Sequence, residues 1–276
     1  FYEGDTAVGQ KLKYSVNTYL DAKKDEGSKE LLSAIHHYGE AADAYVKANE
    51  LRVLITSDLH FTSLEGNYNR FGMTLDARAQ KWVDAINKEH ETEPLDLIVV
   101  NGDISLDHWQ GYGNTSGAYY DDQKGESADI IQKYFSDLPT GVPVVVMPGN
   151  HEQYSNADWK AIAGTDRQGF MVLNNSLFLF LDNYKVEETA TGPSDGTYTK
   201  TDVAYIKEMM NQYPSCDVYL ISHMFEMGEE SAEFKTLVAN NDRIKGLFEG
   251  HTHNAATLTP EGLGGKTIAQ TGTFAH

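Results

Sequence analysis

Short apolar runs alternate with longer amphipathic stretches from residue 51 to the end of the chain. The runs are almost continuously apolar, which is typical of parallel strands that are covered on both faces. Five runs are predicted to form such strands: Leu51–Thr56, Leu95–Val100, Val142–Met147, Asp217–Ile221 and Ile244–Phe248. A hairpin of Met171–Leu173 and Leu177–Leu181 and a last strand at Lys266–Gln270 are predicted as well.

Between these strands, apolar residues recur at spacings of three and four, which predicts helices. The predicted helical stretches are Leu75–Ile86, Ile130–Phe135, Val203–Met210 and Phe234–Val238. Repeated strand, helix and strand implies right-handed crossovers and an α/β fold whose sheet is covered on both faces. Two polar, glycine-rich stretches, Gly111–Gly125 and Glu187–Thr199, are predicted to be surface loops around a site.

The first 50 residues follow a different pattern. Ser28 is a predicted helix cap, and an apolar stripe follows it from Leu31 to Tyr45. A shorter helix is predicted at Tyr14–Leu20, with a turn near Gly27. We therefore expect residues 1–50 to be a helical appendage and residues 51–276 to be the main domain.

The net charge of the chain disfavours binding to nucleic acid or to a membrane surface. The chain has 22 lysines and arginines against 41 aspartates and glutamates, a net charge of −19. Such a surface repels nucleic acid and anionic lipid, although it leaves a small phosphate ester possible where cations bind locally. No apolar run is long enough to span a bilayer, so we expect a soluble domain. The single Cys216 cannot form an internal disulfide, so the cysteine count does not indicate the cellular compartment.

Polar residues with the chemistry of metal ligands follow five of the predicted strands. In open α/β sheets, ligands bind beyond the carboxyl ends of the strands, so these residues are expected to share one site. They are Asp58 and His60, Asp103, Asn150 and His151, His223, and His251 and His253. Any one of them could instead be a helix cap or a satisfied core residue, but their common position after five strands favours a shared site.

Imidazole, carboxylate and amide groups form a mixed nitrogen and oxygen set that suits zinc, iron or manganese. The strings Asp58-x-His60, Gly102-Asp103, Gly149-Asn150-His151-Glu152, His223 and Gly250-His251-x-His253 resemble the motifs of the calcineurin-like metallophosphoesterases. The resemblance covers about residues 51–276. It implies a β-sandwich flanked by helices, an αββα arrangement, with two metal ions at the sheet ends.

The resemblance also implies a role for each residue. Asp58, His60 and His253 would bind one divalent or trivalent ion, and Asn150, His223 and His251 would bind another. Asp103 would bridge the two ions and hold a hydroxide that attacks phosphorus. His151 would be catalytic, stabilising phosphoryl charge or protonating the leaving oxygen, and Glu152 would be a hydrogen-bond partner of the ligands.

The chain also departs from parts of the family pattern. Asp107-His108 follows Gly102-Asp103 where protein phosphatases carry an Asp-Arg pair, and Leu106 stands where purple acid phosphatases carry a tyrosine, so both subgroups are disfavoured. Asp107 is expected either to orient His151 or to cap a helix, and His108 either to contact phosphate or to be exposed. The aromatic residues after them are expected either to stack a nucleobase or sugar or to anchor the loop: Trp109, Tyr112, Tyr119 and Tyr120.

We therefore expect metal-dependent hydrolysis of a small phosphomonoester or phosphodiester, including nucleotide-like esters. A nuclease and a non-catalytic, metal-bearing surface module are the alternatives, and protein partners are not indicated. Residues 14–49 resemble a helical segment of surface proteins of Gram-positive bacteria, which implies a secreted or cell-surface parent. Because the sequence starts at Phe1 and ends at His276, we expect an excised fragment whose natural chain continues.

Overall fold

The computed structural model describes residues 50–62, 72–106, 126–185 and 196–274. The chain divides into two compact units, Phe1–Leu51 and Arg52–His276, and every described helix and strand belongs to the second. The two predicted N-terminal helices and the predicted loop Gly111–Gly125 lie outside the described residues. In the part of the chain that is described, no helix is both long and apolar enough to cross a membrane.

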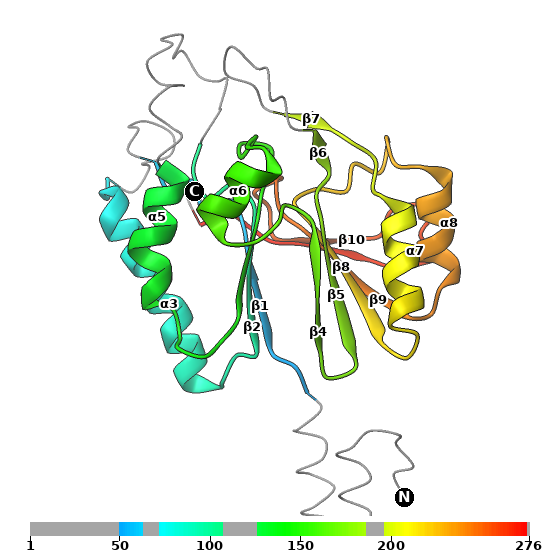
Figure 1. Ribbon diagram of the computed structural model, residues 1–276, viewed down its shortest axis with the longest axis horizontal. Coiled ribbons are helices and arrows are strands. Elements are labelled where there is room, and N and C mark those ends of the chain that lie inside the picture. The colour runs from blue at the N-terminus through cyan, green and yellow to red at the C-terminus, as the bar shows by residue number, and fades with distance from the viewer. Residues whose placement is uncertain (1–49, 63–71, 107–125, 186–195, 275–276) are drawn as a thin grey trace, which may run out of the picture. The chain divides into compact units, whose positions relative to one another are not determined.

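A smaller, three-stranded sheet carries the first three predicted strands. Its strands β1 (Val53–Thr56), β2 (Leu97–Asn101) and β3 (Val144–Met147) are all parallel, in the order β1-β2-β3. Three helices pack on one face of this sheet (Figure 1). They are α3 (Leu75–Thr92), α5 (Glu126–Tyr134), which continues into a 3-10 turn η3 (Phe135–Asp137), and α6 (Asn156–Ala163).

A larger, six-stranded sheet carries the later strands in the order β10-β11-β9-β8-β5-β4. Its inner strands β5 (Ser176–Leu181), β8 (Asp217–Ser222), β9 (Ile244–Glu249) and β11 (Ile268–Gln270) are parallel. Its edges β4 (Gly169–Leu173) and β10 (Ala256–Leu258) are antiparallel to their neighbours. Helices α7 (Val203–Gln212) and α8 (Ala232–Asn240) pack on it, and a ribbon of β6 (Tyr184–Lys185) and β7 (Thr197–Tyr198) stands apart.

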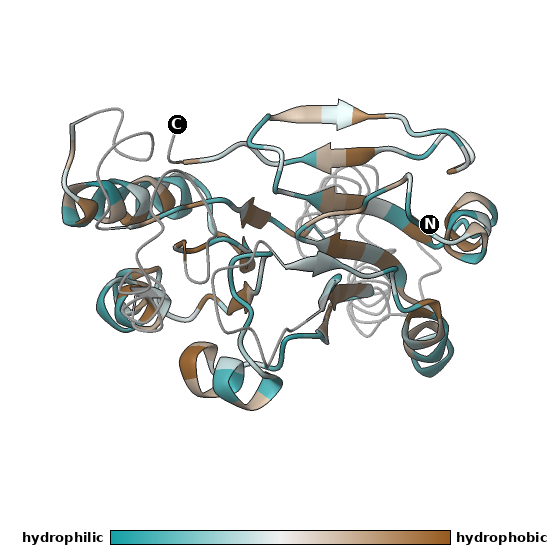
Figure 2. Ribbon diagram, turned by 90° about the horizontal axis from the view of Figure 1, so that it is seen from above, coloured by the Kyte–Doolittle hydropathy of each residue, from teal (hydrophilic) through white to brown (hydrophobic). Residues whose placement is uncertain are grey.

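Alternation along the strands shows how the two sheets are layered. Ile98 and Val100 of β2 are buried against the helices of the smaller sheet, whereas Leu97 and Val99, on the other face, are equally buried but belong to neither helical core. On the larger sheet, Phe180 of β5 is placed in the same way. These residues lie between the sheets, so the fold is an αββα sandwich, with mostly hydrophobic strands between amphipathic helices (Figure 2).

The sequence predictions agree with most of this architecture. All five parallel runs are strands, and the predicted hairpin and the four helices predicted after residue 51 are present within a few residues. Each sheet is covered on both faces as expected, although helices cover only one face and the other sheet covers the second. Helix α6 and the β6–β7 ribbon were not predicted, and β7 lies inside Glu187–Thr199, which was expected to be a loop. Both elements are too short for a clear periodic signal.

Candidate metal centre

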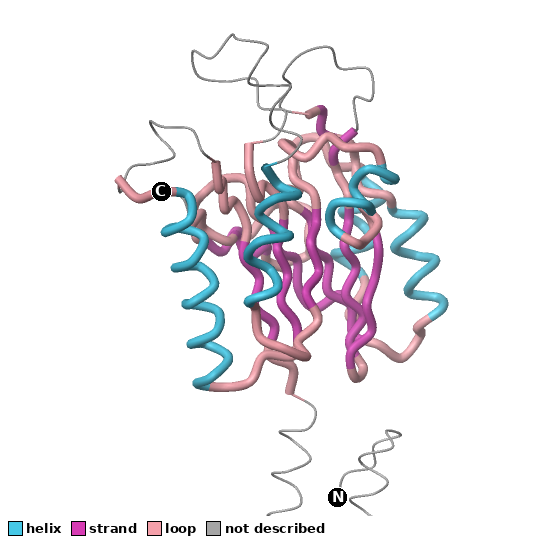
Figure 3. The backbone as a smooth tube through the Cα atoms, turned by 60° about the vertical axis from the view of Figure 1, so that its left-hand side comes forward, coloured by secondary structure: helices cyan, strands magenta, loops and turns pink. Residues whose placement is uncertain are grey.

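The loops that follow the parallel strands gather at one end of the sandwich (Figure 3). The backbone joins neighbouring loops directly: the Asp58 N–H donates to the Gly102 carbonyl at 3.1 Å, and the His60 N–H donates to the Asp103 carbonyl at 3.0 Å. In the larger sheet the Gly250 N–H donates to the His223 carbonyl at 2.9 Å. An isolated parallel bridge between Ser57 and Thr273 links the end of β1 to the segment after β11.

The predicted site residues adopt an uncommon backbone conformation. Left-handed φ values occur at Asp58 (53°), His60 (43°), Asp103 (54°), His251 (64°) and His253 (61°). For non-glycine residues this conformation costs about 1–3 kcal/mol each, and it persists where the surrounding structure enforces it, typically at functional sites. The pair Asp58 and His60 and the pair His251 and His253 therefore share the same left-handed backbone conformation, although they come from different sheets.

Three glycines allow the loops to approach one another. A Cβ on Gly149 would lie 2.1 Å from Oδ1 of Asp103, and a Cβ on Gly250 would lie 2.1 Å from Oγ of Ser57. A Cβ on Gly102, where φ is +84°, would lie 2.5 Å from Nδ1 of His223. The glycines in the sequence strings are thus required by close packing between the loops that carry the polar side chains.

One group of side chains contains Asp58, His60 and His253. The Nε2 atoms of His60 and His253 are 2.9 Å apart, and Oδ1 of Asp58 lies 3.4 Å from Nε2 of His253 and 3.7 Å from Nε2 of His60. This Oδ1 atom is buried and accepts no hydrogen bond from any described residue. A buried carboxylate oxygen that faces ring nitrogens without a hydrogen bond is suited to a cation.

A second group contains Asn150, His223 and His251. Oδ1 of Asn150 lies 3.1 Å from Nε2 of His223 and 2.9 Å from Nδ1 of His251. The other ring nitrogen of His223 lies 2.7 Å from the Asn101 carbonyl, which can only accept, so Nδ1 carries a proton and Nε2 faces the group. This is the orientation in which a histidine binds a metal through Nε2.

Asp103 lies between the two groups. Its Oδ2 atom is 3.2 Å from Nε2 of His223 in the second group and 4.0 Å from Nε2 of His60 in the first. The same oxygen is 3.7 Å from Nε2 of His151, whose backbone N–H donates to Oδ1 of Asp103 at 3.2 Å. One carboxylate therefore reaches both groups and His151.

The pKa values reflect this mixture of burial and charge. Burial raises the pKa of Asp103, but the imidazoles of His223, His151 and His60 outweigh it and hold the pKa well below its ordinary value. Burial lowers the pKa of His223, but Asp103 and Asp58 outweigh it and raise the pKa to about 10. Burial dominates at His60 and lowers its pKa to about 3, so its imidazole is neutral, the form that binds metals.

Glu152 faces the backbone of the loops and lies outside both groups. Its carboxylate accepts hydrogen bonds from the N–H groups of Gly149, Asp103 and Ile104 at 2.8–2.9 Å. It is fully buried. Glu152 thereby holds the loop after β3 against the loop after β2.

Sequence reasoning did not single out several residues that support the centre. The Asn101 amide donates to the Ser222 carbonyl at 2.8 Å, which links β2 to β8 just below the site. The ring of Tyr184 lies 5.9 Å from that of His223 and 6.2 Å from that of His251. Asn101 could have been found from the sequence, because it is a polar residue directly before Gly102-Asp103, whereas nothing in the local pattern marks Tyr184.

The predicted substrate-contacting residues of the loop after β2 lie outside the described residues. They are Asp107, His108, Trp109, Tyr112, Tyr119 and Tyr120.

The residues present fit metal ions. Three sets of ligand atoms lie within 4.8 Å of one another, namely those of Asp58, His60 and His253, of His60, Asp103 and His151, and of Asp103, His223 and His251. The donors are nitrogen and oxygen atoms, a set that suits zinc, iron or manganese. The sets overlap through Asp103 and His60, so the arrangement could hold more than one ion in one centre.

Comparisons with known proteins point the same way. A family model described as calcineurin-like phosphoesterase matches residues 51–255. A "Probable cyclic nucleotide phosphodiesterase" of Pseudoalteromonas sp. (strain SM9913) is 25% identical over 219 residues, which cover 76% of this chain and 74% of that protein. One solved structure aligns with a TM-score of 0.47 and 16% identity over 80% of this chain and 90% of that chain, a likeness too low to support an argument.

Proposed function

The chain belongs to the calcineurin-like phosphoesterase family, and on that premise we propose that it hydrolyses a small phosphodiester at a centre of two metal ions. Family membership makes it a metal-dependent hydrolase that acts on phosphoester bonds. The number of ions, the residues that bind them and the class of ester are the parts that we propose.

The position of Asp103 carries the proposal of two ions. Its Oδ2 atom lies within 4.0 Å of ring nitrogens from both side-chain groups, so a single carboxylate can contact an ion in each. Asp58, His60 and His253 would bind one ion, and Asn150, His223 and His251 would bind the other. Asp103 would then contribute to the binding of both ions.

Each side chain then has a chemical task. When bound, the ions would supply Lewis-acid activation of a water molecule and of the phosphoryl oxygens. His151 lies beside Asp103 but outside the two proposed ligand sets, so its imidazole is placed to stabilise phosphoryl charge or to donate a proton to the leaving oxygen. Glu152 and the Asn101 carbonyl keep the ligands in place.

The relative's printed name supports a diester, because it describes a cyclic nucleotide phosphodiesterase. A net charge of −19 opposes the binding of a polynucleotide, so the proposed substrate is a small ester of the nucleotide type and the protein is not proposed to be a nuclease. The resemblance of residues 14–49 to bacterial surface proteins supports, in addition, a proposal that the parent protein is exported.

Metal analysis together with a substrate screen tests the proposed function. We expect two ions of zinc, iron or manganese per chain, loss of turnover after chelation, and recovery when Mn²⁺ is added back. We also expect a higher kcat/KM for a bis-nitrophenyl phosphate diester and a cyclic nucleotide than for nitrophenyl phosphate. Turnover by the metal-stripped protein would refute the metal mechanism, one ion per chain would refute the pair, and a preference for the monoester would refute the substrate class.

A further inference from the structure

A buried arginine outside the metal centre joins the two sheets next to it. Arg167 precedes β4 and is 4% exposed. Its Nε donates to Oδ2 of Asp182 at 2.7 Å and its Nη2 donates to Oδ1 at 3.1 Å, so the ion pair is bidentate. Asp182 follows β5, the partner of β4 in the larger sheet, so Arg167 is anchored to that sheet.

The remaining donor of Arg167 points to the other sheet. Its Nη1 donates to the carbonyls of Glu152 and Tyr154, and the second of these bonds measures 3.0 Å. Both carbonyls belong to the loop that follows β3 of the smaller sheet. This loop carries Asn150 and His151, so the guanidinium holds their loop through its backbone.

The metal centre needs such a connection because its ligands are divided between the sheets. In the second group, Asn150 comes from the smaller sheet, whereas His223 and His251 come from the larger one. Ligand distances of about 2 Å leave little tolerance, so a small change in the spacing of the sheets would separate these atoms. The first group is also divided, since His253 comes from the larger sheet, but Asp58 and His60 share one loop. The Asp58 carboxylate accepts from the His251 N–H of the larger sheet at 2.9 Å, which links these loops without Arg167.

Lysine could not replace this arginine. A planar guanidinium directs one edge at a carboxylate and other donors at two carbonyls at the same time, whereas an ammonium is a point charge on a flexible stem. The protein uses a lysine for an exposed pair close by, since Lys160 of α6 pairs with Asp166 at 3.1 Å. The two pairs lie in the same connection between β3 and β4. Of the two cations, Arg167 is the one that bonds to the loop carrying Asn150 and His151.

We propose that Arg167, held by Asp182, is a positioning residue that sets Asn150 against His223 and His251 and so determines the affinity of the ion bound there. This inference rests on the proposed two-metal site. It predicts that loss of the guanidinium weakens one ion far more than the other. A purely structural role would lower the melting temperature and weaken both ions together.

The test uses the full chain, stripped of metal and titrated with Mn²⁺ by calorimetry, with bound metal counted by elemental analysis. Arg167→Lys should weaken one of two ions by roughly 10- to 100-fold, the usual effect of a residue that orients a ligand, and leave the other within about threefold. Asp182→Asn should act in the same direction with a smaller effect, and it serves if Arg167→Lys does not fold. Lys160→Met, which removes the exposed pair, should change neither ion.

Two reference variants identify the ion that is lost. Asn150→Ala should remove the same ion, so adding Arg167→Lys to it should cause little further loss, whereas adding Arg167→Lys to His253→Ala should weaken both ions. A wild-type chain with two ions, together with variants at 167 and 182 that keep both or lose both equally, would overturn this inference alone. A wild-type chain that binds a single ion would overturn the two-metal proposal and this inference with it.

Discussion

The two sheets contribute different chemistry to the same centre. The smaller sheet supplies every oxygen donor of the proposed ligand set, together with His60, and its site residues are all buried. The larger sheet supplies three imidazoles, of which His251 and His253 are partly exposed. The smaller sheet therefore forms the buried side of the centre, where the carboxylates are gathered, and the loop after β9 forms the accessible side.

The hydrogen bonds beneath the loops differ in the same way. Glu152 of the smaller sheet's loop accepts four backbone N–H groups from two loops, three of them at 2.8–2.9 Å and that of Ser105 at 3.5 Å. Glu249, which ends β9, accepts one backbone N–H from Phe225 at 2.8 Å and the side-chain amide of Gln270 at 2.7 Å. The comparison indicates that the smaller sheet tolerates change less, and the following substitutions test this from the largest expected effect to the smallest.

Asp103→Asn should have the largest effect, because it removes the carboxylate that lies between the two side-chain groups. Loss of a bridging charge from a metal pair is worth about 4 kcal/mol or more, which lowers turnover by on the order of a thousandfold. Turnover and bound metal should both fall, with the far-ultraviolet circular dichroism unchanged. Full turnover in this variant would mean that Asp103 does not bridge the ions.

Glu152→Gln should come next. An amide has one acceptor oxygen in place of two, so at least one buried N–H group loses its partner and faces an NH₂ group. The free energy of unfolding should fall by about 3 kcal/mol, and the metal affinity by roughly 10- to 100-fold. Urea denaturation and Mn²⁺ titration measure the two effects.

Glu249→Gln, the same substitution in the larger sheet, should cost much less. The amide oxygen can still accept the Phe225 N–H, and Gln270 can turn its own oxygen toward the new NH₂ group. Burial also raises the pKa of Glu249, so the ionised carboxylate is destabilising in the folded protein, increasingly so as the pH rises through that pKa, and the neutral amide removes this cost.

At pH 7 we therefore expect the unfolding free energy of Glu249→Gln to stay within about 1 kcal/mol of wild type. Urea denaturation of both glutamine variants in parallel measures the difference between the sheets. Equal losses at Glu152 and Glu249 would contradict the view that the smaller sheet tolerates change less than the larger one.

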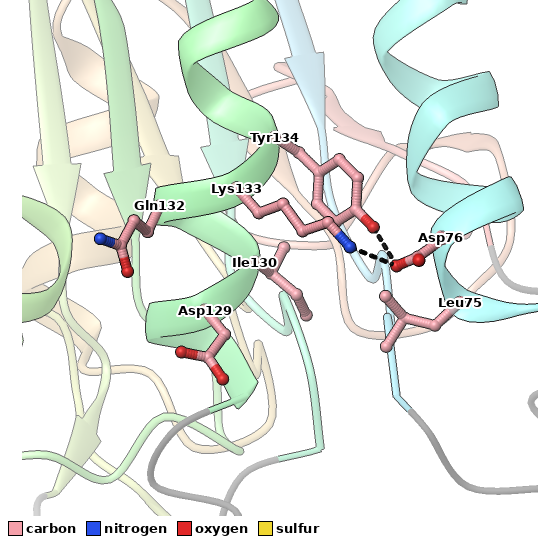
Figure 4. A pocket seen from close by; sticks show the side chains of 7 residues that line it. All are labelled: Leu75, Asp76, Asp129, Ile130, Gln132, Lys133 and Tyr134. Atoms are coloured by element: carbon pink, nitrogen blue, oxygen red, sulfur yellow. Dashed lines mark hydrogen bonds and ion pairs between the residues drawn. The ribbon is translucent and has the colours of Figure 1, made fainter.

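Lys133→Met should have the smallest effect. Lys133 and Tyr134 of α5 both contact Asp76 of α3 in a pocket of about 460 Å³ in the outer helical layer (Figure 4). The Lys133–Asp76 pair is exposed, and such pairs contribute little to stability. Bound metal and turnover should equal those of wild type, and the melting temperature should change less than in either glutamine variant. A loss of metal would show that the helical layer influences the centre.

The strands of the smaller sheet and the polar residues after them were predicted, because a continuous apolar run followed by Gly102-Asp103 or Gly149-Asn150 is a local signal. Helix α6 was not predicted, since Trp159 is its only buried residue and a single apolar position makes no stripe. Arg167 could not be predicted either, because its partners are two carbonyls and a carboxylate that only folding brings together.

The sequence by itself determined which residue types stand at the strand ends, and hence the family and the nitrogen and oxygen chemistry of the site, because these depend on short patterns and on composition. The family resemblance already implied a bridging role for Asp103, but only the tertiary structure gave its distances to the two groups, the left-handed backbones of five site residues, and the link that Arg167 makes between the sheets. These features depend on contacts between segments far apart in the chain, and the packing of the two sheets determines their distances.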